Sequence, residues 1–259
     1  MSELEKYCYN TNRDMLDVET SWWETDNEVA FELHRHEQAQ SLIDNGFLDE
    51  NGEMIDCVKY SINEYGFRTY KMDNLELGGV MVLGDSISFG LGNPVEHMWV
   101  TKLEKETGKK VYNLAAPGGS HCAAKRIFDS WYDTLQPSCV IFVEPPVART
   151  EFWQDNIQTW SRVGPWNLIH FTEYAHLIDN DEKNENRARA VREGFKEICD
   201  RDGVKLIIDQ TTDFFSEHWD YNNWRAKLKA NVQRGRDLAH PGEDYQTELF
   251  NRIYANYVL

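Results

Sequence analysis

The stretch Gly79-Val80-Met81-Val82-Leu83-Gly84-Asp85-Ser86-Ile87-Ser88-Phe89 decides the fold of this chain. Its apolar run at 80–83 is typical of a short strand that is buried on both faces of a sheet. The Gly-Asp-Ser turn that follows predicts a sharp change from strand to helix. At such a turn we expect the side chain of Ser86 to be exposed. We expect its backbone N–H to point out of the first helical turn, where the helix dipole favours negative charge.

Further short apolar runs alternate with helical patterns along the rest of the chain. The runs cover residues 110–114, 139–143 and 204–208. Apolar residues at helical spacing follow Pro94, recur over 124–135 and 188–198, and return after Pro241. This alternation predicts an α/β fold with a mainly parallel sheet and helices on both faces. Ligands bind such sheets beyond the carboxyl ends of the strands, which is where we expect Ser86.

Two parts of the chain depart from this alternation. Residues 1–60 are polar and aromatic with weak periodicity. We interpret them as an N-terminal extension packed on a core domain at 61–259, with one helix predicted over 26–43. Residues 144–180 are rich in Trp, Phe, Tyr and His and show no clear period. A long insertion of this kind is typical of a lid or a binding loop.

Composition and charge bound the classes of function. The chain has 259 residues and a net charge of −17, so we expect it to repel a polyanion such as nucleic acid. No apolar stretch reaches the length of a membrane span, and the acidic N-terminus lacks the apolar core of a signal peptide. We therefore expect a cytoplasmic protein.

The sequence indicates no metal site and no cofactor. The five cysteines form no Cys-x-x-Cys pattern, so we expect reduced thiols and no zinc site. His34 and His36 resemble a metal pair, but residues two apart face different sides of a helix.

Asp237 and His240 lie three residues apart near the other end of the chain, directly before Pro241. A serine hydroxyl is a weak nucleophile until a base takes its proton. We predict that His240 is this base for Ser86 and that Asp237 holds the imidazole in the required tautomer. Taken singly, Gly-Asp-Ser is a common turn and Asp-x-x-His-Pro is an ordinary helix cap. The catalytic interpretation depends on both motifs standing in one βα pattern.

Three blocks together resemble the SGNH/GDSL hydrolase family of esterases and lipases. The blocks are Gly84-Asp85-Ser86 with Phe89-Gly90, Asn113-Leu114-Ala115-Ala116-Pro117-Gly118, and Asp237-Leu238-Ala239-His240-Pro241. The resemblance covers residues 60–259. It implies a flavodoxin-like, three-layer α/β/α fold with a mainly parallel five-stranded sheet (the SGNH hydrolase fold). It also implies an oxyanion hole that includes the backbone N–H groups of Ser86 and Gly118.

One block departs from the family pattern. After the third strand the family usually has Gly-x-Asn-Asp, and the Asn side chain is a further oxyanion donor. Here the strand runs into Val143-Glu144-Pro145-Pro146-Val147-Ala148-Arg149. Loss of one oxyanion donor costs about 10²–10³ in rate. We predict that Arg149, with five N–H donors, takes this role or binds a substrate oxygen. The alternative is an arginine paired with Glu144 or Glu151.

Three more residues are candidates for substrate contact. Asp85 stands beside the serine. His121 follows the second block, and the alternative is a loop histidine without a ligand. Trp153 lies in the aromatic insertion together with Trp160, Trp166 and Phe171. These rings either stack on a sugar or cover an acyl chain, or they pack against the domain.

These observations predict a serine esterase that cleaves a carboxylic ester through an acyl-enzyme. The expected substrate is a small-molecule or carbohydrate ester, and removal of acetyl groups from a sugar is one such reaction. The alternatives are an O-acyltransferase on the same fold, with a sugar hydroxyl in place of water, and a binding or structural module with weak or no catalysis. The sequence leaves the oligomeric state open.

Overall fold

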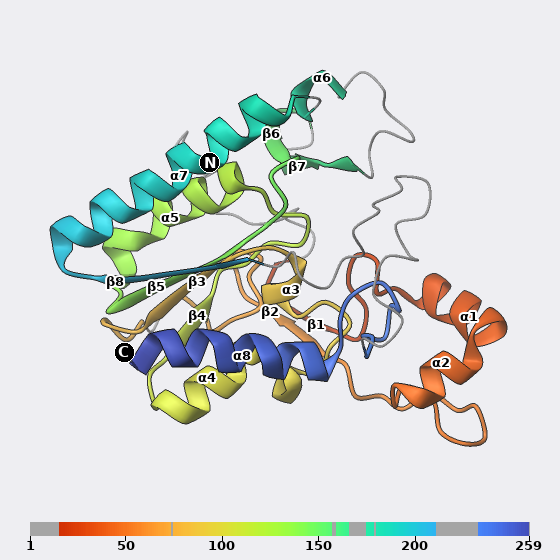
Figure 1. Cartoon of the computed structure of the whole chain (residues 1–259). Helices are drawn as coiled ribbons and strands as arrows, with labels where there is room; N and C mark the ends of the chain where they lie inside the picture. Colours follow the sequence, from red (N-terminus) through yellow and green to blue (C-terminus); the bar gives the residue numbers. More distant parts are fainter. Residues whose placement is uncertain are drawn as a thin grey trace.

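The computed structural model describes residues 16–73, 75–156, 159–165, 175–178, 180–210 and 233–258. A parallel sheet runs through its centre, and Figure 1 shows helices on both sides of it. The strands are β3 (Val80–Leu83), β4 (Val111–Asn113), β5 (Cys139–Glu144) and β8 (Lys205–Gln210), in the order β4-β3-β5-β8. The predicted α/β class with a mainly parallel sheet is confirmed.

The residues of β3 alternate between two hydrophobic cores, as the two-residue period of a strand requires. Val80 and Val82 face a core shared with α4 (Trp99–Thr107) and α8 (Glu243–Val258). Met81 and Leu83 face a core shared with α5 (His121–Leu135) and α7 (Asp181–Asp202). Figure 1 shows these helix pairs on opposite faces of the sheet. The apolar run that opens the sequence motif is therefore buried on both faces.

The expected five-stranded sheet is wrong for the described part of the chain, in which the sheet has four strands. The fifth strand came from the family resemblance, because the sequence itself offers four apolar runs. The described segment 233–241 contains Gln, Arg, Gly and Asp, which are poorly suited to a buried strand. It forms a loop closed by a bridge between Arg234 and Pro241. Residues 211–232 lie outside the described residues.

The first described segment folds into β1 (Val18–Thr20), α1 (Glu28–Glu37), α2 (Ala39–Asp44) and β2 (Tyr60–Ile62), with β1 antiparallel to β2. The single helix expected over 26–43 is wrong, because the helix is interrupted at Gln38, which lies between α1 and α2. In one straight helix Phe31 and Leu42 would lie about 16 Å apart along the axis. The break lets both side chains enter one buried cluster.

That cluster joins the N-terminal segment to the rest of the chain. Besides Phe31 and Leu42 it contains Phe89, Ala115 and Leu238. These last residues belong to the three sequence blocks, so the N-terminal segment packs directly around the predicted site. The division into an extension at 1–60 and a domain at 61–259 stays a prediction.

The aromatic insertion contains an antiparallel hairpin of β6 (Thr150–Gln154) and β7 (Thr159–Val163), followed by the short helix α6 (Ala175–Ile178). Trp153 and Trp160 are cross-strand partners in this hairpin. Trp166 and Phe171 lie outside the described residues.

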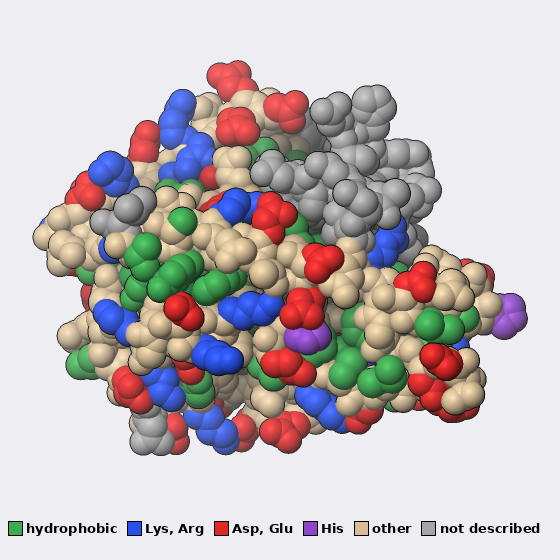
Figure 2. Space-filling model, turned by 60° about the horizontal axis from the view of Figure 1, so that its bottom comes forward, with side chains coloured by type: hydrophobic (Ala, Val, Ile, Leu, Met, Phe, Trp, Pro, Cys, Tyr) green, Lys and Arg blue, Asp and Glu red, His purple; other side chains and the backbone are tan. Residues whose placement is uncertain are grey.

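The described surface mixes side chains of different kinds. Figure 2 shows acidic, basic and hydrophobic side chains interspersed on one face of the molecule. Within the described ranges, no helix combines the length and the apolar character that a membrane span needs.

Candidate active site

Ser86 is the first residue of α3 (Ser86–Phe89), just beyond the carboxyl end of β3. The expected exposure of its side chain is wrong, because Ser86 is buried and His240 lies against its hydroxyl. The carboxylate of Asp85 caps this helix, because its Oδ1 accepts the N–H of Ile87 at 3.0 Å. Gly84 allows the tight turn: a Cβ at this position would lie 2.8 Å from Ser88 Oγ and 3.2 Å from Val143 O. The first N–H groups of a helix have no partner within the helix, so the backbone N–H of Ser86 can bind an anion beside its own hydroxyl.

The structure brings Ser86, His240 and Asp237 into one chain of hydrogen bonds. His240 Nε2 lies 2.8 Å from Ser86 Oγ, and His240 Nδ1 lies 2.6 Å from Asp237 Oδ2. The other oxygen of Asp237 accepts the backbone N–H groups of Ala239 at 3.1 Å and His240 at 3.0 Å. The Asp-x-x-His spacing thus lets one carboxylate fix both the loop and the imidazole.

The loop that carries Asp237 and His240 is strained and tightly held. Leu238 has a φ of 52°, a left-handed conformation that is costly for a bulky residue and is found at functional sites that their surroundings hold in place. The surroundings do so here: Leu238 is buried in the N-terminal cluster, and its N–H donates to Gly235 O at 2.9 Å. Gly235 in turn donates to His240 O at 2.8 Å.

Asp237 and His240 shift each other's pKa in the direction that keeps both charged. Burial raises the pKa of Asp237, but the His240 charge and the hydrogen bonds to the carboxylate outweigh burial and lower this pKa to about 2. For His240, burial lowers the pKa, while the Asp237 charge and hydrogen bond raise it, and the net shift is above the ordinary 6.5. The imidazole is therefore a stronger base than a free histidine.

The second sequence block forms a turn beside Gly84, two residues before Ser86. Gly119 N donates to Ala116 O at 2.7 Å, and Gly118 has a φ of 66°. Pro then Gly at the two central positions, with a positive φ at the Gly, is typical of a type II turn. The turn is bound to the serine strand, because Ala116 N donates to Gly84 O at 3.1 Å. It thus holds the Gly118 peptide next to the segment that ends in Ser86.

Two arginines from the insertion bind this turn. Arg162, on β7, donates through Nη1 to the carbonyl oxygen of Pro117. Arg149 Nη1 lies 2.8 Å from Asp85 Oδ2 and 3.4 Å from Gly119 O. The positive charge of Arg149 also lowers the pKa of His240, although less than Asp237 raises it. Arg149 is thus at the site, and its role as an oxyanion donor stays a prediction.

The carboxylates considered as alternative partners of Arg149 have other contacts. Glu151 Oε1 lies 2.6 Å from Arg126 Nε. Glu144 Oε1 lies 2.8 Å from Arg192 Nη1.

The other predicted substrate contacts are placed as follows. Asp85 is buried and uses both oxygens within the protein, one on α3 and one on Arg149. His121 is the first residue of α5 and not a loop residue, and its Nε2 lies 3.0 Å from Glu144 Oε1. Trp153 Nε1 donates to Asp155 Oδ1 at 2.7 Å. For all three, contact with substrate stays a prediction.

The residues that bind Asp237 and its neighbour Arg236 from the N-terminal segment were not predicted from the sequence. Thr25 and Asp26 contact Asp237 and Arg236, respectively. No periodic pattern marked the N-terminal pair. Arg236 could have been suspected from the sequence, because it is a charged residue directly before Asp237 and would need an acidic partner if the loop were buried.

No metal site is evident in the described ranges, where no group of three or more His, Cys, Asp or Glu side chains is arranged to hold an ion. His34 is buried and lies 3.4 Å from the Gln38 amide. Cys57, Cys122, Cys139 and Cys199 are free thiols, and Cys8 lies outside the described residues.

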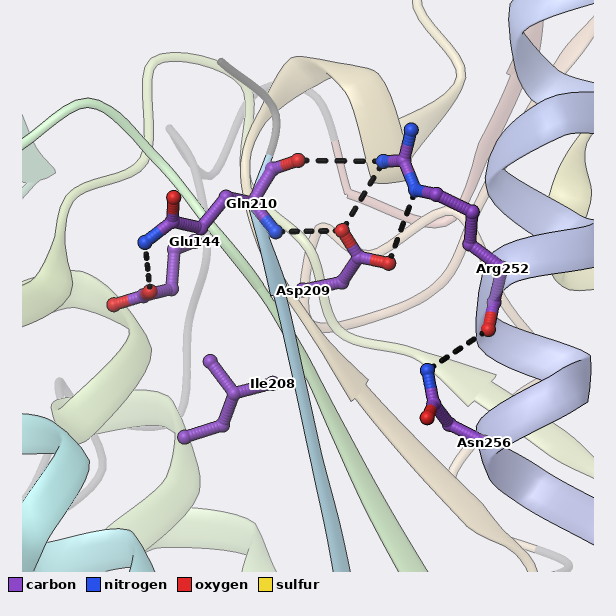
Figure 3. Close-up of a pocket in the computed structure, with 6 residues that line it drawn as sticks. All are labelled: Glu144, Ile208, Asp209, Gln210, Arg252 and Asn256. Carbon is purple, nitrogen blue, oxygen red and sulfur yellow. Dashed lines mark hydrogen bonds and ion pairs between the residues drawn. The ribbon is translucent and has the colours of Figure 1, made fainter. Parts of the chain in front are cut away.

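A separate surface pocket lies beside the edge strand β8 (Figure 3). Its lining residues are Glu144, Ile208, Asp209, Gln210, Arg252 and Asn256, and they include no member of the Ser86–His240–Asp237 chain. Figure 3 shows that its polar groups bind one another, as in the 3.1 Å contact between Arg252 Nη2 and Asp209 Oδ1.

Comparison with known proteins gave solved structures only; no family model and no curated protein matches the chain. The psychrotrophic esterase EstA from a Pseudoalteromonas species is 13% identical, with 70% of this chain and 96% of that chain covered and a TM-score of 0.35. A G-D-S-L family protein from Desulfitobacterium hafniense, to which lipolytic activity is attributed, is 15% identical, with 70% and 99% covered and a TM-score of 0.35. A family 3 carbohydrate esterase from Clostridium thermocellum is 14% identical, with 70% and 94% covered and a TM-score of 0.33.

One of these structures carries the name of the family that the sequence blocks resemble. The TM-scores of all three structures lie below 0.5, so the site of this chain is defined by its own fold and side chains. These define an α/β protein with a Ser–His–Asp arrangement at the carboxyl edge of a parallel sheet.

Proposed function

We propose that the chain is a serine hydrolase of the SGNH/GDSL class that cleaves carboxylic esters through an acyl-enzyme. The observation that carries this proposal is the continuous chain from Ser86 Oγ to His240 Nε2 at 2.8 Å and from His240 Nδ1 to Asp237 Oδ2 at 2.6 Å. Nucleophile, base and orienting acid within hydrogen-bonding distance are the parts that acyl transfer needs.

In the first half-reaction Ser86 Oγ attacks the ester carbonyl while His240 Nε2 takes the hydroxyl proton. The tetrahedral oxyanion lies near the N–H groups of Ser86 and Gly118, which stabilise charge as it develops. The C–O bond to the alcohol then breaks, and His240 returns the proton to the leaving oxygen. The acyl group is left as an ester on Ser86.

In the second half-reaction water replaces the alcohol. His240 takes a proton from the water, whose oxygen attacks the acyl carbonyl, and the C–O bond to Ser86 breaks as the serine regains a proton. Throughout, Asp237 stabilises the imidazolium and fixes its orientation. Arg149 fits this scheme as a group that holds Asp85 and the oxyanion turn. Arg149→Met should lower kcat if the guanidinium stabilises the oxyanion, and an unchanged kcat/KM would exclude that role.

A fluorophosphonate probe tests the proposal directly, because it reacts with an activated serine. We expect the folded wild type to be labelled, with the adduct on Ser86 by mass spectrometry, and labelling to be lost in Ser86→Ala and His240→Ala. Ser88→Ala is a matched control on the same helix: Ser88 is buried, and its Oγ has no hydrogen-bond partner among the described residues. Absence of label on the folded wild type, or label that persists in Ser86→Ala, would overturn the proposal.

A panel of substrates then defines the ester. Short- and long-chain aryl esters are compared with acetylated sugars. Acetylated sugars are included because the aromatic rings of the insertion could stack on a sugar. One ring of this insertion already has a partner within the protein, because the Arg126 guanidinium lies over the Trp160 ring, 4.4 Å from its centre. Analysis of the products with an added alcohol separates hydrolysis from acyl transfer.

A further inference from the structure

The N-terminal segment reaches the acid of the proposed triad. Thr25 Oγ1 donates a hydrogen bond to Asp237 Oδ2 at 2.8 Å. The acceptor is the same oxygen that lies 2.6 Å from His240 Nδ1. Asp237 is buried, so water is largely excluded from this carboxylate and Thr25 is one of its few donors.

The neighbouring residues form a second contact between the same two segments. Asp26 accepts Arg236 Nε at 2.9 Å on one oxygen and Arg236 Nη2 at 2.8 Å on the other. The exposed fractions of Asp26 and Arg236 are 1% and 0%. Tyr60, which is also buried, donates its hydroxyl to Asp26 Oδ2 at 2.6 Å. The dipeptide 25–26 therefore binds the dipeptide 236–237 residue by residue.

The loop after the serine helix closes this network. Arg236 N donates to Gly92 O at 2.8 Å, and Gly92 N donates to Tyr60 Oη at 2.8 Å. Gly92 has a φ of 73°, and a Cβ there would lie 3.0 Å from Arg236 N and 3.1 Å from Asp237 Oδ1. The loop that carries Arg236 and Asp237, the loop after α3 and the N-terminal segment thus pack closely together at Gly92.

We infer that the N-terminal segment completes the active site, and that Thr25 is a positioning residue that fixes the Asp237 carboxylate on His240. The inference rests on the proposed function. Residues 16–62 lie almost wholly outside the region that the family blocks cover, so no block predicts this contribution. Thr25 does not touch the reacting atoms; it acts by limiting rotation of the carboxylate, whose Oδ2 must stay in line with Nδ1 as the imidazole becomes charged.

The test compares two substitutions that differ in one hydroxyl. Thr25→Val keeps the shape of the side chain and removes the donor, while Thr25→Ser keeps the donor. A hydrogen bond to a charged group is worth enough to lower kcat by about 10- to 100-fold when it is lost. We expect this loss in Thr25→Val with KM unchanged, and recovery of most of kcat in Thr25→Ser.

Thr20→Val is the matched control, because the Thr20 hydroxyl forms its hydrogen bonds with the backbone of Trp22, at 3.2 Å, and not with Asp237. It should keep the wild-type kcat. Thermal unfolding checks that each variant is folded, and Thr25→Ala replaces Thr25→Val if the latter does not fold. A folded Thr25→Val or Thr25→Ala enzyme with wild-type kcat would overturn the inference, as would a loss that Thr25→Ser does not restore.

A measurement without substrate separates this inference from the proposed function. The proton on His240 Nδ1 should give a protected NMR signal in the wild type and in Thr25→Ser, and an exchange-broadened one in Thr25→Val. A folded wild type that no fluorophosphonate labels would contradict the proposed function, while this signal would still decide whether Thr25 holds the pair. Equal protection in all three proteins would overturn the role of Thr25.

Discussion

Replacement of Glu144 by Gln should destabilise the protein at neutral pH and much less in acid. Glu144 ends β5, at the position where the third family block departs. Its carboxylate is 5% exposed and accepts hydrogen bonds from His121 at 3.0 Å, Arg192 at 2.8 Å and Gln210 at 3.2 Å. Figure 3 shows the contact with Gln210.

The magnitude follows from the pKa of this carboxyl. Burial raises the pKa of Glu144, but the hydrogen bonds from His121, Arg192 and Gln210 outweigh it and lower the pKa from 4.5 to about 2. A carboxyl group whose pKa is lower in the folded state than in the unfolded state stabilises the fold at pH values above its unfolded-state pKa. This stabilisation is lost as the pH falls through the folded-state pKa. At about 1.4 kcal/mol per unit, the carboxylate contributes about 3 kcal/mol at pH 7, of which more than half is lost by about pH 3.

The assay is urea unfolding followed by tryptophan fluorescence, at several pH values between 7 and 3. We expect Glu144→Gln to lower the free energy of unfolding at pH 7 by about 3 kcal/mol, and the gap from wild type to narrow as pH falls. Glu248→Gln is the control, since Glu248 forms an exposed pair with Arg252 on one helix and such pairs contribute little. A gap that does not change with pH would refute the reasoning, as would equal stability at pH 7.

Three further changes have defined outcomes. Because the pKa of His240 is raised above 6.5, kcat/KM for an ester should reach half its maximum above that pH, and a midpoint at or below it would contradict the assignment. Gly92→Ala should lower thermal stability more than Gly108→Ala, because both have positive φ but only the first Cβ meets backbone, at 3.0 Å. Arg162→Met should lower kcat about tenfold with KM unchanged, since a charge-assisted bond holds the peptide unit that carries the Gly118 N–H; unchanged kcat would disprove this.

The parts of the site that sequence alone predicted are those fixed by local spacing. Ser86 follows a strand whose residues alternate between two cores, and Asp237 and His240 share one short loop. In each case the residues that define the motif also define the geometry. For these segments, strand period, turn residues and the three-residue spacing agree with the fold.

Other features depend on contacts that no local pattern encodes. Thr25 binds Asp237 across 212 residues, and nothing in the polar segment around Thr25 marks it. The helix break at Gln38 reflects where Phe31 and Leu42 must pack, which overrides helix propensity. The fifth strand was expected from a family pattern and not from an apolar run.

The ion pair of Asp26 and Arg236 is the centre of the buried network that joins the N-terminal segment to the loop of Asp237. Burial raises the pKa of Asp26 even though Arg236 and Tyr60 pull it down, so the folded protein holds this carboxylate against a net penalty for its charge. Buried pairs of this kind are poor sources of stability, and their best-attested use is to fix one arrangement of the chain. Here the arrangement is the strained loop at Leu238, with its φ of 52°. The directional bonds of the pair therefore fix the position of this loop, and an apolar replacement would leave Asp237 without that constraint.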